Sequence, residues 1–309
     1  MEKHDAVLIT TRIEHKSILS FAEDDKFSSR IIYVDVDKKG KVDLEQLDQL
    51  CSALYENDLK ILVSIQGANS EIGTIQSIKE ISKIVHRYGG VFHTDATQLL
   101  SNQKMNMKEN GIDMMSMSGQ KIHAPKGIGL LYVKNGITLS PLIYGSQMNG
   151  LRGGTENVPY IAGLHVAFYK LEEDYKKSND VKRIRDLMKS LIIKHIKNVR
   201  FNGAEFDRLT NNINISFKGI NSESLLLLLD MNGICVSSGS ACNSNSTDVS
   251  TTLKEIGVPD EYIYGTIRIT ISDDIKENDV YEIVDTIKKN VNTLREVSID
   301  KEYNKTNGN

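Results

Sequence analysis

Lys121 lies in a segment whose composition suits covalent chemistry. A Ser118-Gly119 turn precedes it, and Pro125, Gly127 and Gly129 follow. Glycine lets the backbone approach a ligand closely, and a lysine held in such a tight loop suits Schiff-base formation with a carbonyl group. The alternative is a surface turn with solvated lysines, so the assignment of Lys121 depends on the rest of the sequence.

Cys242 is the second candidate for covalent chemistry, as a nucleophilic thiol. It lies among the small and polar residues 237–246, a stretch that we expect to be mobile and exposed. A thiol in such surroundings is available to react, whereas Cys235 lies in an apolar run, where we expect it to belong to the core. A free cysteine in a flexible loop is also a common chance occurrence, so Cys242 needs support from other motifs as well.

Asp95 and Arg268 are charged residues at positions that suit ligand binding. Asp95 follows the apolar strand predicted over residues 91–94, and α/β sheets place ligand-binding side chains at such strand ends. Its carboxylate would pair with the ring nitrogen of pyridoxal phosphate, or it would cap a following helix. Arg268 stands alone in the apolar run 266–270, so it needs an anionic partner, either a structural carboxylate or a substrate carboxylate.

His15 and the segment 152–157 are further candidates. The flat ring of His15 would stack on a cofactor ring, although a lone histidine is commonly a surface or capping residue. In the segment, Arg152, two glycines and Thr155 place a guanidinium group, flexible backbone and a hydroxyl group before a predicted helix. This combination fits either an anion site or an ordinary helix start.

The elements that would position these residues follow two patterns. In the first part of the chain, short β-branched runs alternate with helical periodicity, which indicates an α/β layer with a mostly parallel sheet. Longer helices, predicted at 160–175 and 181–197, then indicate a smaller C-terminal α+β domain. We predict a cofactor-binding large domain over 1–145, the remainder of its interface and the small domain over 146–299, and a disordered tail over 300–309.

Composition narrows the class of protein. The 309 residues are 39% hydrophobic and 26% charged, with a formal net charge of -3, which favours a globular protein and argues against a nucleic-acid or anionic-membrane partner. No segment approaches the length of a membrane span, and three cysteines fit reduced thiols better than a disulfide framework. We expect a cytoplasmic protein whose partner is a small molecule or another protein.

In their order along the chain, these segments resemble the cysteine desulfurases, members of the class V aminotransferase group of fold-type I pyridoxal phosphate enzymes. The similarity extends from about Ile13 to Leu294. The segments that carry it are Glu14–Ser17, Glu71–Gln76, His93–Gln98, Lys121 with 125–129, Gly154–Asn157 and Ser237–Cys242. The resemblance implies a three-layer large domain on a mostly parallel sheet and a smaller C-terminal α+β domain.

The resemblance implies that several residues hold pyridoxal 5'-phosphate. Lys121 matches the lysine that is linked covalently to the cofactor, and Asp95 matches the partner of its ring nitrogen. Gln98 matches a hydrogen-bond donor to the ring oxygen, and His15 matches an imidazole that stacks on the ring. Ser118 matches a phosphate ligand, and Thr155 matches a phosphate ligand donated from a second subunit.

The resemblance also implies the reaction and the partners. Arg268 matches the arginine that holds the carboxylate of L-cysteine, and Cys242 matches the cysteine that attacks its sulfur and leaves an enzyme persulfide and L-alanine. The expected partners are a second copy of the chain in a homodimer, and an iron-sulfur scaffold or another sulfur-acceptor protein. The persulfide would serve iron-sulfur cluster assembly or tRNA thiolation.

The sequence departs from the family pattern at several positions. We expect it to lack the N-terminal stretch with a Gly-Ala-Thr turn that binds the cofactor phosphate. Gln120 replaces a usual histidine, Ser70 replaces an asparagine within reach of the cofactor's ring oxygen, and Met148 replaces a glutamate. Two alternatives therefore stay open: a truncated, catalytically impaired homologue that at most binds partners of sulfur transfer, and another class V aminotransferase or a selenocysteine lyase.

Overall fold

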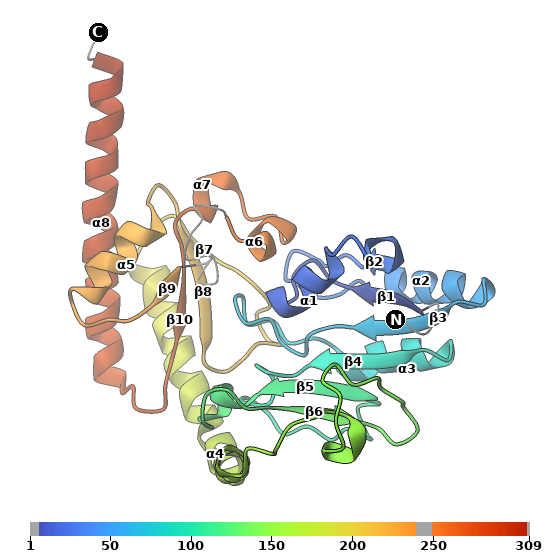
Figure 1. Ribbon diagram of the computed structural model, residues 1–309. Coiled ribbons are helices and arrows are strands. Elements are labelled where there is room, and N and C mark those ends of the chain that lie inside the picture. Colours follow the sequence, from blue (N-terminus) through green and yellow to red (C-terminus); the bar gives the residue numbers. More distant parts are fainter. Residues whose placement is uncertain (1–5, 239–248, 308–309) are drawn as a thin grey trace.

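A computed structural model describes residues 6–238 and 249–307, with side chains up to residue 297. Its larger sheet has the strand order β2-β1-β3-β4-β5-β6, and neighbouring strands are parallel except for β5 and β6. Figure 1 shows this sheet in blue to green. The strands are β1 Ala6–Thr10, β2 Ile31–Tyr33, β3 Lys60–Ser64, β4 Val91–Asp95, β5 Met114–Ser118 and β6 Gly129–Val133.

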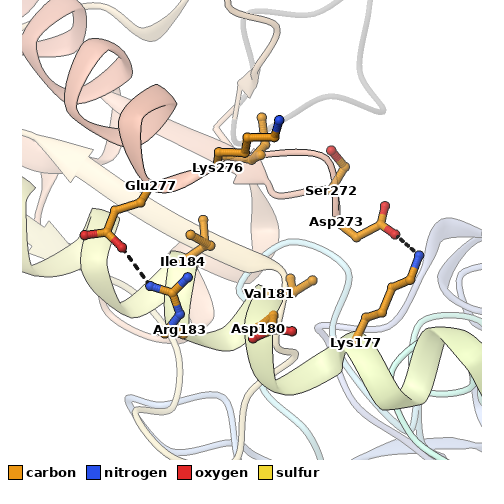
Figure 2. A pocket seen from close by; sticks show the side chains of 10 residues that line it. Lys177, Asp180, Val181, Arg183, Ile184, Ser272, Asp273, Lys276 and Glu277 are labelled. Carbon is orange, nitrogen blue, oxygen red and sulfur yellow. Dashed lines mark hydrogen bonds and ion pairs between the residues drawn. The ribbon is translucent and has the colours of Figure 1, made fainter.

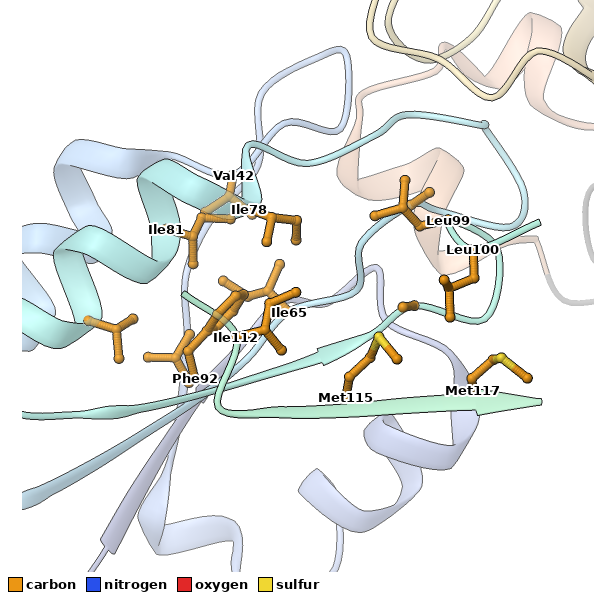
Figure 3. Close-up of a cluster of buried hydrophobic side chains, with 14 of the residues drawn as sticks. Val42, Ile65, Ile78, Ile81, Phe92, Leu99, Leu100, Ile112, Met115 and Met117 are labelled. Atoms are coloured by element: carbon orange, nitrogen blue, oxygen red, sulfur yellow. The ribbon is translucent and has the colours of Figure 1, made fainter. Parts of the chain in front are cut away.

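Two amphipathic helices, α2 (Leu44–Glu56) and α3 (Ile78–Arg87), pack against each other and against this sheet. Helix α2 begins after Asp43, whose carboxylate accepts hydrogen bonds from two backbone N–H groups of the first turn. Ile81 and Phe92 are fully buried in the core between helices and sheet (Figure 3). Burying one such side chain contributes about 1.5–3 kcal/mol, so this layer holds the strand ends in place.

A smaller antiparallel sheet has the order β7-β8-β10-β9. Its strands are β7 Val199–Phe201, β8 Asn212–Phe217, β9 Ser237–Ser238 and β10 Thr266–Thr270. Helices α5 (Ser222–Asp230) and α8 (Glu277–Asn307) pack near it, with the second half of the long helix α4 (Val158–His195). The predicted fold class is therefore confirmed: an α/β domain with a mostly parallel sheet and a smaller C-terminal α+β domain (Figure 1).

Helix α4 (Val158–His195) corrects the prediction of two separate helices. The residues between the two predicted helices are polar but include neither proline nor glycine, so the backbone continues without a break. Leu171 in its first half belongs to the core of the large sheet, and Met188 in its second half belongs to the core of the small sheet. One helix thus contributes to both cores.

The C-terminal helix α8 reaches Asn307, although we expected a disordered tail from residue 300. The polar residues after 300 contain no proline and no glycine before Gly308, so the backbone hydrogen bonds of the helix continue. Figure 1 shows α8 extending beyond the rest of the molecule. Within the described part of the chain, no helix combines the length and the apolar character that crossing a membrane requires.

Short helices complete the structure. They are α1 Lys16–Ala22, α6 Thr251–Glu255 and α7 Asp260–Ile263, with the 3-10 helices η1 Ser28–Arg30, η2 Gly119–Ile122 and η3 Met148–Gly150. Helix η2 follows β5 directly and carries Lys121, while α6 begins just after the residues that the structure leaves undescribed.

Candidate active site

A cleft of about 490 Å³ lies where loops of the large sheet meet α4 and the end of β10. Four of the predicted site residues line it: Ser70, Gln98, Lys121 and Arg268. Gln120, which replaces the histidine of the family pattern, lines it as well. The structure therefore brings together residues that lie as much as 198 positions apart in the sequence.

Lys121 is exposed on η2, immediately beyond the end of β5. The turn before it depends on Gly119, because a Cβ atom there would lie 3.0 Å from the carbonyl oxygen of Ile128 and 3.1 Å from Cβ of Ala124. Within the described chain, no acidic side chain forms an ion pair with Lys121. An unpaired amine at a cleft is available to react with a carbonyl compound.

Asp95 ends β4 and lies half-buried at the carboxyl end of the parallel strands. Its Oδ1 accepts a hydrogen bond of 2.9 Å from the backbone N–H of Thr97. The residues after Asp95 form a turn and not a helix, so Asp95 stabilises a turn instead of capping the predicted helix. Oδ2 has no hydrogen-bond partner among the described residues and is free for a ligand.

His93, two residues earlier on the same face of β4, links three strands. Its Nδ1 lies 2.8 Å from Oγ of Ser64, and its Nε2 lies 3.2 Å from Oγ of Ser116. Burial lowers the pKa of His93 and outweighs the opposing attraction of Asp95, so the ring is neutral at physiological pH. The strands that carry Asp95 and Ser118 are thereby held beside each other.

Ser118 ends β5, and its backbone N–H donates a hydrogen bond of 3.2 Å to Oγ1 of Thr97. This contact joins the loop that follows Asp95 to the turn that carries Lys121. Ser118 itself does not line the cleft, and it lies at the strand end beside it.

His15 is exposed and caps helix α1, since its Nδ1 accepts a hydrogen bond of 3.2 Å from the backbone N–H of Ser17. A nitrogen that accepts a hydrogen bond carries no proton, so in this arrangement the ring proton sits on Nε2. The preceding backbone is held firmly: the carbonyl oxygen of Ile13 accepts hydrogen bonds from the side chains of Gln66 and Asn69, at 2.6 and 2.9 Å. Sequence reasoning missed these two amides, although both follow the apolar strand β3.

Glu14 also holds the segment that carries His15 in place. Its carboxylate accepts hydrogen bonds from the backbone N–H of Gln66 and from Oγ1 of Thr11. Burial raises the pKa of Glu14 to about 8, although these hydrogen bonds oppose the shift. The carboxyl group is therefore a buried acid that holds His15 near the strand ends.

Arg268 reaches the cleft from β10. Its Nη1 donates to the carbonyl oxygen of Ser70 at 3.1 Å, and its Nη2 donates to Oγ of Ser237 at 3.2 Å. Its Nε is buried and has no hydrogen-bond partner in the described part of the chain, where no carboxylate forms an ion pair with it. Of the two partners that the sequence allowed, a substrate carboxylate fits this arrangement better than a structural one.

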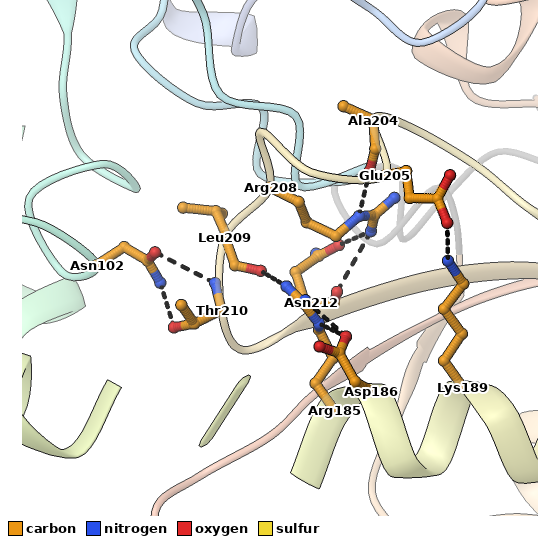
Figure 4. A network of polar contacts seen from close by, with 10 residues as sticks. All are labelled: Asn102, Arg185, Asp186, Lys189, Ala204, Glu205, Arg208, Leu209, Thr210 and Asn212. Atoms are coloured by element: carbon orange, nitrogen blue, oxygen red, sulfur yellow. Dashed lines mark hydrogen bonds and ion pairs between the residues drawn. The ribbon is translucent and has the colours of Figure 1, made fainter. Parts of the chain in front are cut away.

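Two polar networks hold the loops around the cleft. Figure 4 shows Asn102 exchanging hydrogen bonds with Thr210, at 2.9 and 3.2 Å, while Nη1 of Arg185 on α4 donates to the carbonyl oxygen of Leu209. Nearby, the ion pairs Lys177–Asp273 and Arg183–Glu277 join α4 to the segment after β10 (Figure 2). The first network is the more buried of the two, so it contributes more to the rigidity of the cleft.

Thr155 and Cys235 are not among the residues that line the cleft. Thr155 is exposed between η3 and α4 and does not line it. Cys242 lies outside the described residues. Cys235 is exposed, which corrects the expectation that it belongs to the core: its neighbours Ile234 and Val236 pack on the small-sheet core, so the alternating side chain between them faces solvent.

The residues of the cleft, together with Asp95 at the end of β4, which is not part of its lining, fit pyridoxal phosphate and an amino acid. An unpaired lysine amine suits the aldehyde of the cofactor, and the free carboxylate oxygen of Asp95 suits its ring nitrogen. The unpartnered buried Nε of Arg268 indicates a site built for an anion.

Comparison with known proteins decides the family. The sequence pattern of the aminotransferase class-V family matches residues 1–283. The chain belongs to this family. The cysteine desulfurase IscS of Dictyoglomus turgidum is 40% identical over 308 residues, which cover 97% of this chain and 76% of the relative.

Solved structures agree with this assignment. A NifS-like protein has a TM-score of 0.84 and 31% identity, over 95% of this chain and 77% of its own. SspA in complex with cysteine has a TM-score of 0.70 and 30% identity, over 87% of this chain and 74% of its own. The predicted membership of the cysteine desulfurases, with pyridoxal phosphate as the cofactor, is confirmed, and the impaired homologue, the other aminotransferases and selenocysteine lyase are not favoured.

Proposed function

We propose that this chain removes sulfur from L-cysteine, which gives L-alanine, and that Cys242 receives the sulfur as a persulfide. One observation carries the proposal: Arg268, without an acidic ion-pair partner among the described residues, lines the same cleft as Lys121. An amino acid bound there would place its carboxylate on the guanidinium group and its amine near the lysine. The relative SspA, whose structure holds cysteine, supports this choice of substrate.

The cofactor would lie over the carboxyl ends of β4 and β5. Lys121 would hold it covalently, Asp95 would keep the ring nitrogen protonated, and the amide of Gln98 would donate to the ring oxygen. The imidazole of His15 would stack on the ring and Ser118 would bind the phosphate, while Ser70 lies at the edge of the same cleft. When bound, pyridoxal phosphate withdraws electrons from the bonds of the substrate's α-carbon.

The sulfur transfer balances without an external oxidant. The thiolate of Cys242 would form a bond to the sulfur of L-cysteine as the carbon–sulfur bond breaks, and the carbon would keep the electron pair and take up a proton. The described residues flanking Cys242 are anchored, since Ser238 pairs with Ile267 of β10 and Ser250 caps α6. Ser238, the last described residue before Cys242, therefore lies beside the strand that carries Arg268.

A homodimer is the assembly that we propose. Apolar side chains are strongly exposed close to Thr155 in the sequence: Leu142 is 98% exposed and Tyr144 is 82% exposed. Such a surface suits burial against a second copy, which would also let Thr155 reach the partner's cofactor phosphate. We further propose that the persulfide passes to an iron-sulfur scaffold or another sulfur acceptor in the cytoplasm, where thiols stay reduced.

The test is turnover by the purified protein with pyridoxal phosphate, L-cysteine and a reductant. We expect equal amounts of L-alanine and sulfide, and the loss of both in Cys242→Ala. Cys235→Ala is the matched control, because it removes an exposed thiol outside the proposed site and should leave turnover intact. A folded wild-type protein that binds the cofactor but forms no L-alanine would overturn the proposal.

A further inference from the structure

The carboxyl group of Glu71 lies in the described structure next to the guanidinium group that would hold the substrate. Glu71 directly follows Ser70, whose carbonyl oxygen accepts the hydrogen bond from Arg268. Among the described residues, its Oε1 is buried without a hydrogen-bond partner, and the Nε of Arg268 is also buried without one. Two buried and unpartnered atoms of opposite charge on neighbouring groups indicate a functional arrangement rather than a structural ion pair.

The backbone of Glu71 is fixed from both sheets. Its N–H donates 2.8 Å to Oδ1 of Asn69, and its carbonyl oxygen accepts hydrogen bonds of 3.2 and 3.1 Å from Asn212 and Asn214 of β8. These contacts fix the backbone of Glu71 between the loop after β3 and strand β8.

The other carboxyl oxygen of Glu71 contacts helix α6. Oγ of Ser250 donates a hydrogen bond of 2.7 Å to Oε2, and Ser250 also begins α6 by accepting from the backbone N–H of Leu253. Glu71 thus contacts the first helix after the segment that contains Cys242, and it does so beside the arginine on β10.

The groups around the carboxyl group of Glu71 determine its pKa. The uncharged hydroxyl groups of Ser250 and Thr252 on α6 lower the pKa of Glu71, and so does the charge of Arg268 on β10. Asn212 of β8 is also uncharged, although Arg208 donates to its side chain from the loop before β8. Burial outweighs these effects and raises the pKa of Glu71 to about 7.

We propose that Glu71 is a positioning residue that sets how strongly Arg268 binds the carboxylate of L-cysteine, through the charge that Glu71 itself carries. With a neutral Glu71, the full charge of Arg268 is available to the substrate. With an ionised Glu71, two carboxylates share one guanidinium group, and the substrate is bound less tightly. This inference rests on the proposed binding of L-cysteine by Arg268.

The test compares wild-type holoenzyme with Glu71→Gln at pH 6 and at pH 8.5. Taking the ratio of the two KM values for L-cysteine at each pH cancels the titration of the substrate. We expect a ratio near one at pH 6, a wild-type KM about fivefold above that of the variant at pH 8.5, and similar kcat values, because charge coupling of this kind is worth about fivefold or more.

A binding measurement separates this role from a structural one. Propionate carries a carboxylate without amine or thiol, and its dissociation constant from wild-type holoenzyme, measured by calorimetry, should rise about fivefold between pH 6 and pH 8.5. Since it uses the wild type alone, this measurement holds even if Glu71→Gln fails to fold. Ser250→Ala is the matched control: it removes the hydrogen bond to Oε2 but keeps the carboxyl group, so the dependence on pH should remain.

The outcomes are distinct. A KM ratio and a propionate dissociation constant that do not change with pH would overturn the role of Glu71 while leaving the desulfurase activity standing. A fall in kcat at both pH values, without a change in KM, would show a structural role instead. Absence of L-alanine formation by the wild type at either pH would overturn the proposed function and this inference with it.

Discussion

Nη1 of Arg268 donates a hydrogen bond of 3.1 Å to the carbonyl oxygen of Ser70, and this contact joins the small sheet to the loop after β3. The acceptor is a backbone atom, so the contact does not depend on which side chain stands at position 70. Replacement of the family's asparagine by serine at this position therefore leaves the anchoring of Arg268 intact. What the replacement changes is the polar group that faces the cleft.

Substitution of Arg268 should weaken substrate binding more than it affects folding. Arg268→Lys keeps the positive charge but loses the planar fork that donates hydrogen bonds to both oxygens of a carboxylate. We expect kcat/KM for L-cysteine to fall by about 100-fold, since a charge-assisted hydrogen bond contributes about 1.5–3 kcal/mol. Steady-state kinetics measures this loss. Arg183→Lys, at an exposed ion pair on α4, is the control, and an equal loss there would contradict the prediction.

Substitution of Lys121 should remove covalent retention of the cofactor. The wild-type protein, loaded with pyridoxal phosphate and dialysed, should keep its visible absorbance, whereas Lys121→Ala should lose the cofactor on dialysis because no amine remains to bind it. Lys126→Ala removes the other lysine of the motif and should behave as the wild type. Retention of the cofactor by Lys121→Ala would show that another lysine binds it.

The local patterns in the sequence predicted most elements around the site. The strand predicted over residues 91–94 forms as β4, which also includes Asp95, because side chains that helices bury against a parallel sheet are mostly apolar. Lys121 and Arg268 were found from their types and their neighbours, and the structure places them at one cleft. Their catalytic roles stay predictions.

The remaining features depend on contacts that sequence spacing does not record. The partner of Arg268 lies 198 residues away, and Ser250 lies 179 residues from Glu71, so no local pattern connects them. The exposure of Cys235 depends on which side of its segment packs against the core, and an apolar stretch of sequence does not indicate which of its side chains are buried. Only the path of the chain in space reveals such pairs.

Replacing Asp113 should destabilise the large domain. Burial raises the pKa of this carboxyl group, but hydrogen bonds from the N–H of Phe92, His86 and Lys134 outweigh burial, and the pKa is lowered. Asp113→Asn leaves these donors without a charged acceptor, and we expect the free energy of unfolding to fall by about 3 kcal/mol in urea titrations.

A matched substitution checks that the buried network causes the loss. Asp273→Asn removes one partner of the exposed ion pair with Lys177, so it should cost less than about 1 kcal/mol. Equal losses in the two variants would contradict the importance of the buried contacts of Asp113.

Glu14 should make the stability of the protein depend on pH. Its pKa rises from 4.5 to about 8 on folding, so the folded chain binds a proton that the unfolded chain has released between these values. The stabilisation is complete below pH 4.5 and is lost as the pH rises toward 8, with a slope of at most about 1.4 kcal/mol per pH unit. Urea titrations at pH 5, 6.5 and 8 should show a steeper decline for the wild type than for Glu14→Gln. The exposed Glu23→Gln serves as the control and should decline as the wild type does, whereas parallel declines in all three proteins would mean that Glu14 is already ionised in the folded state.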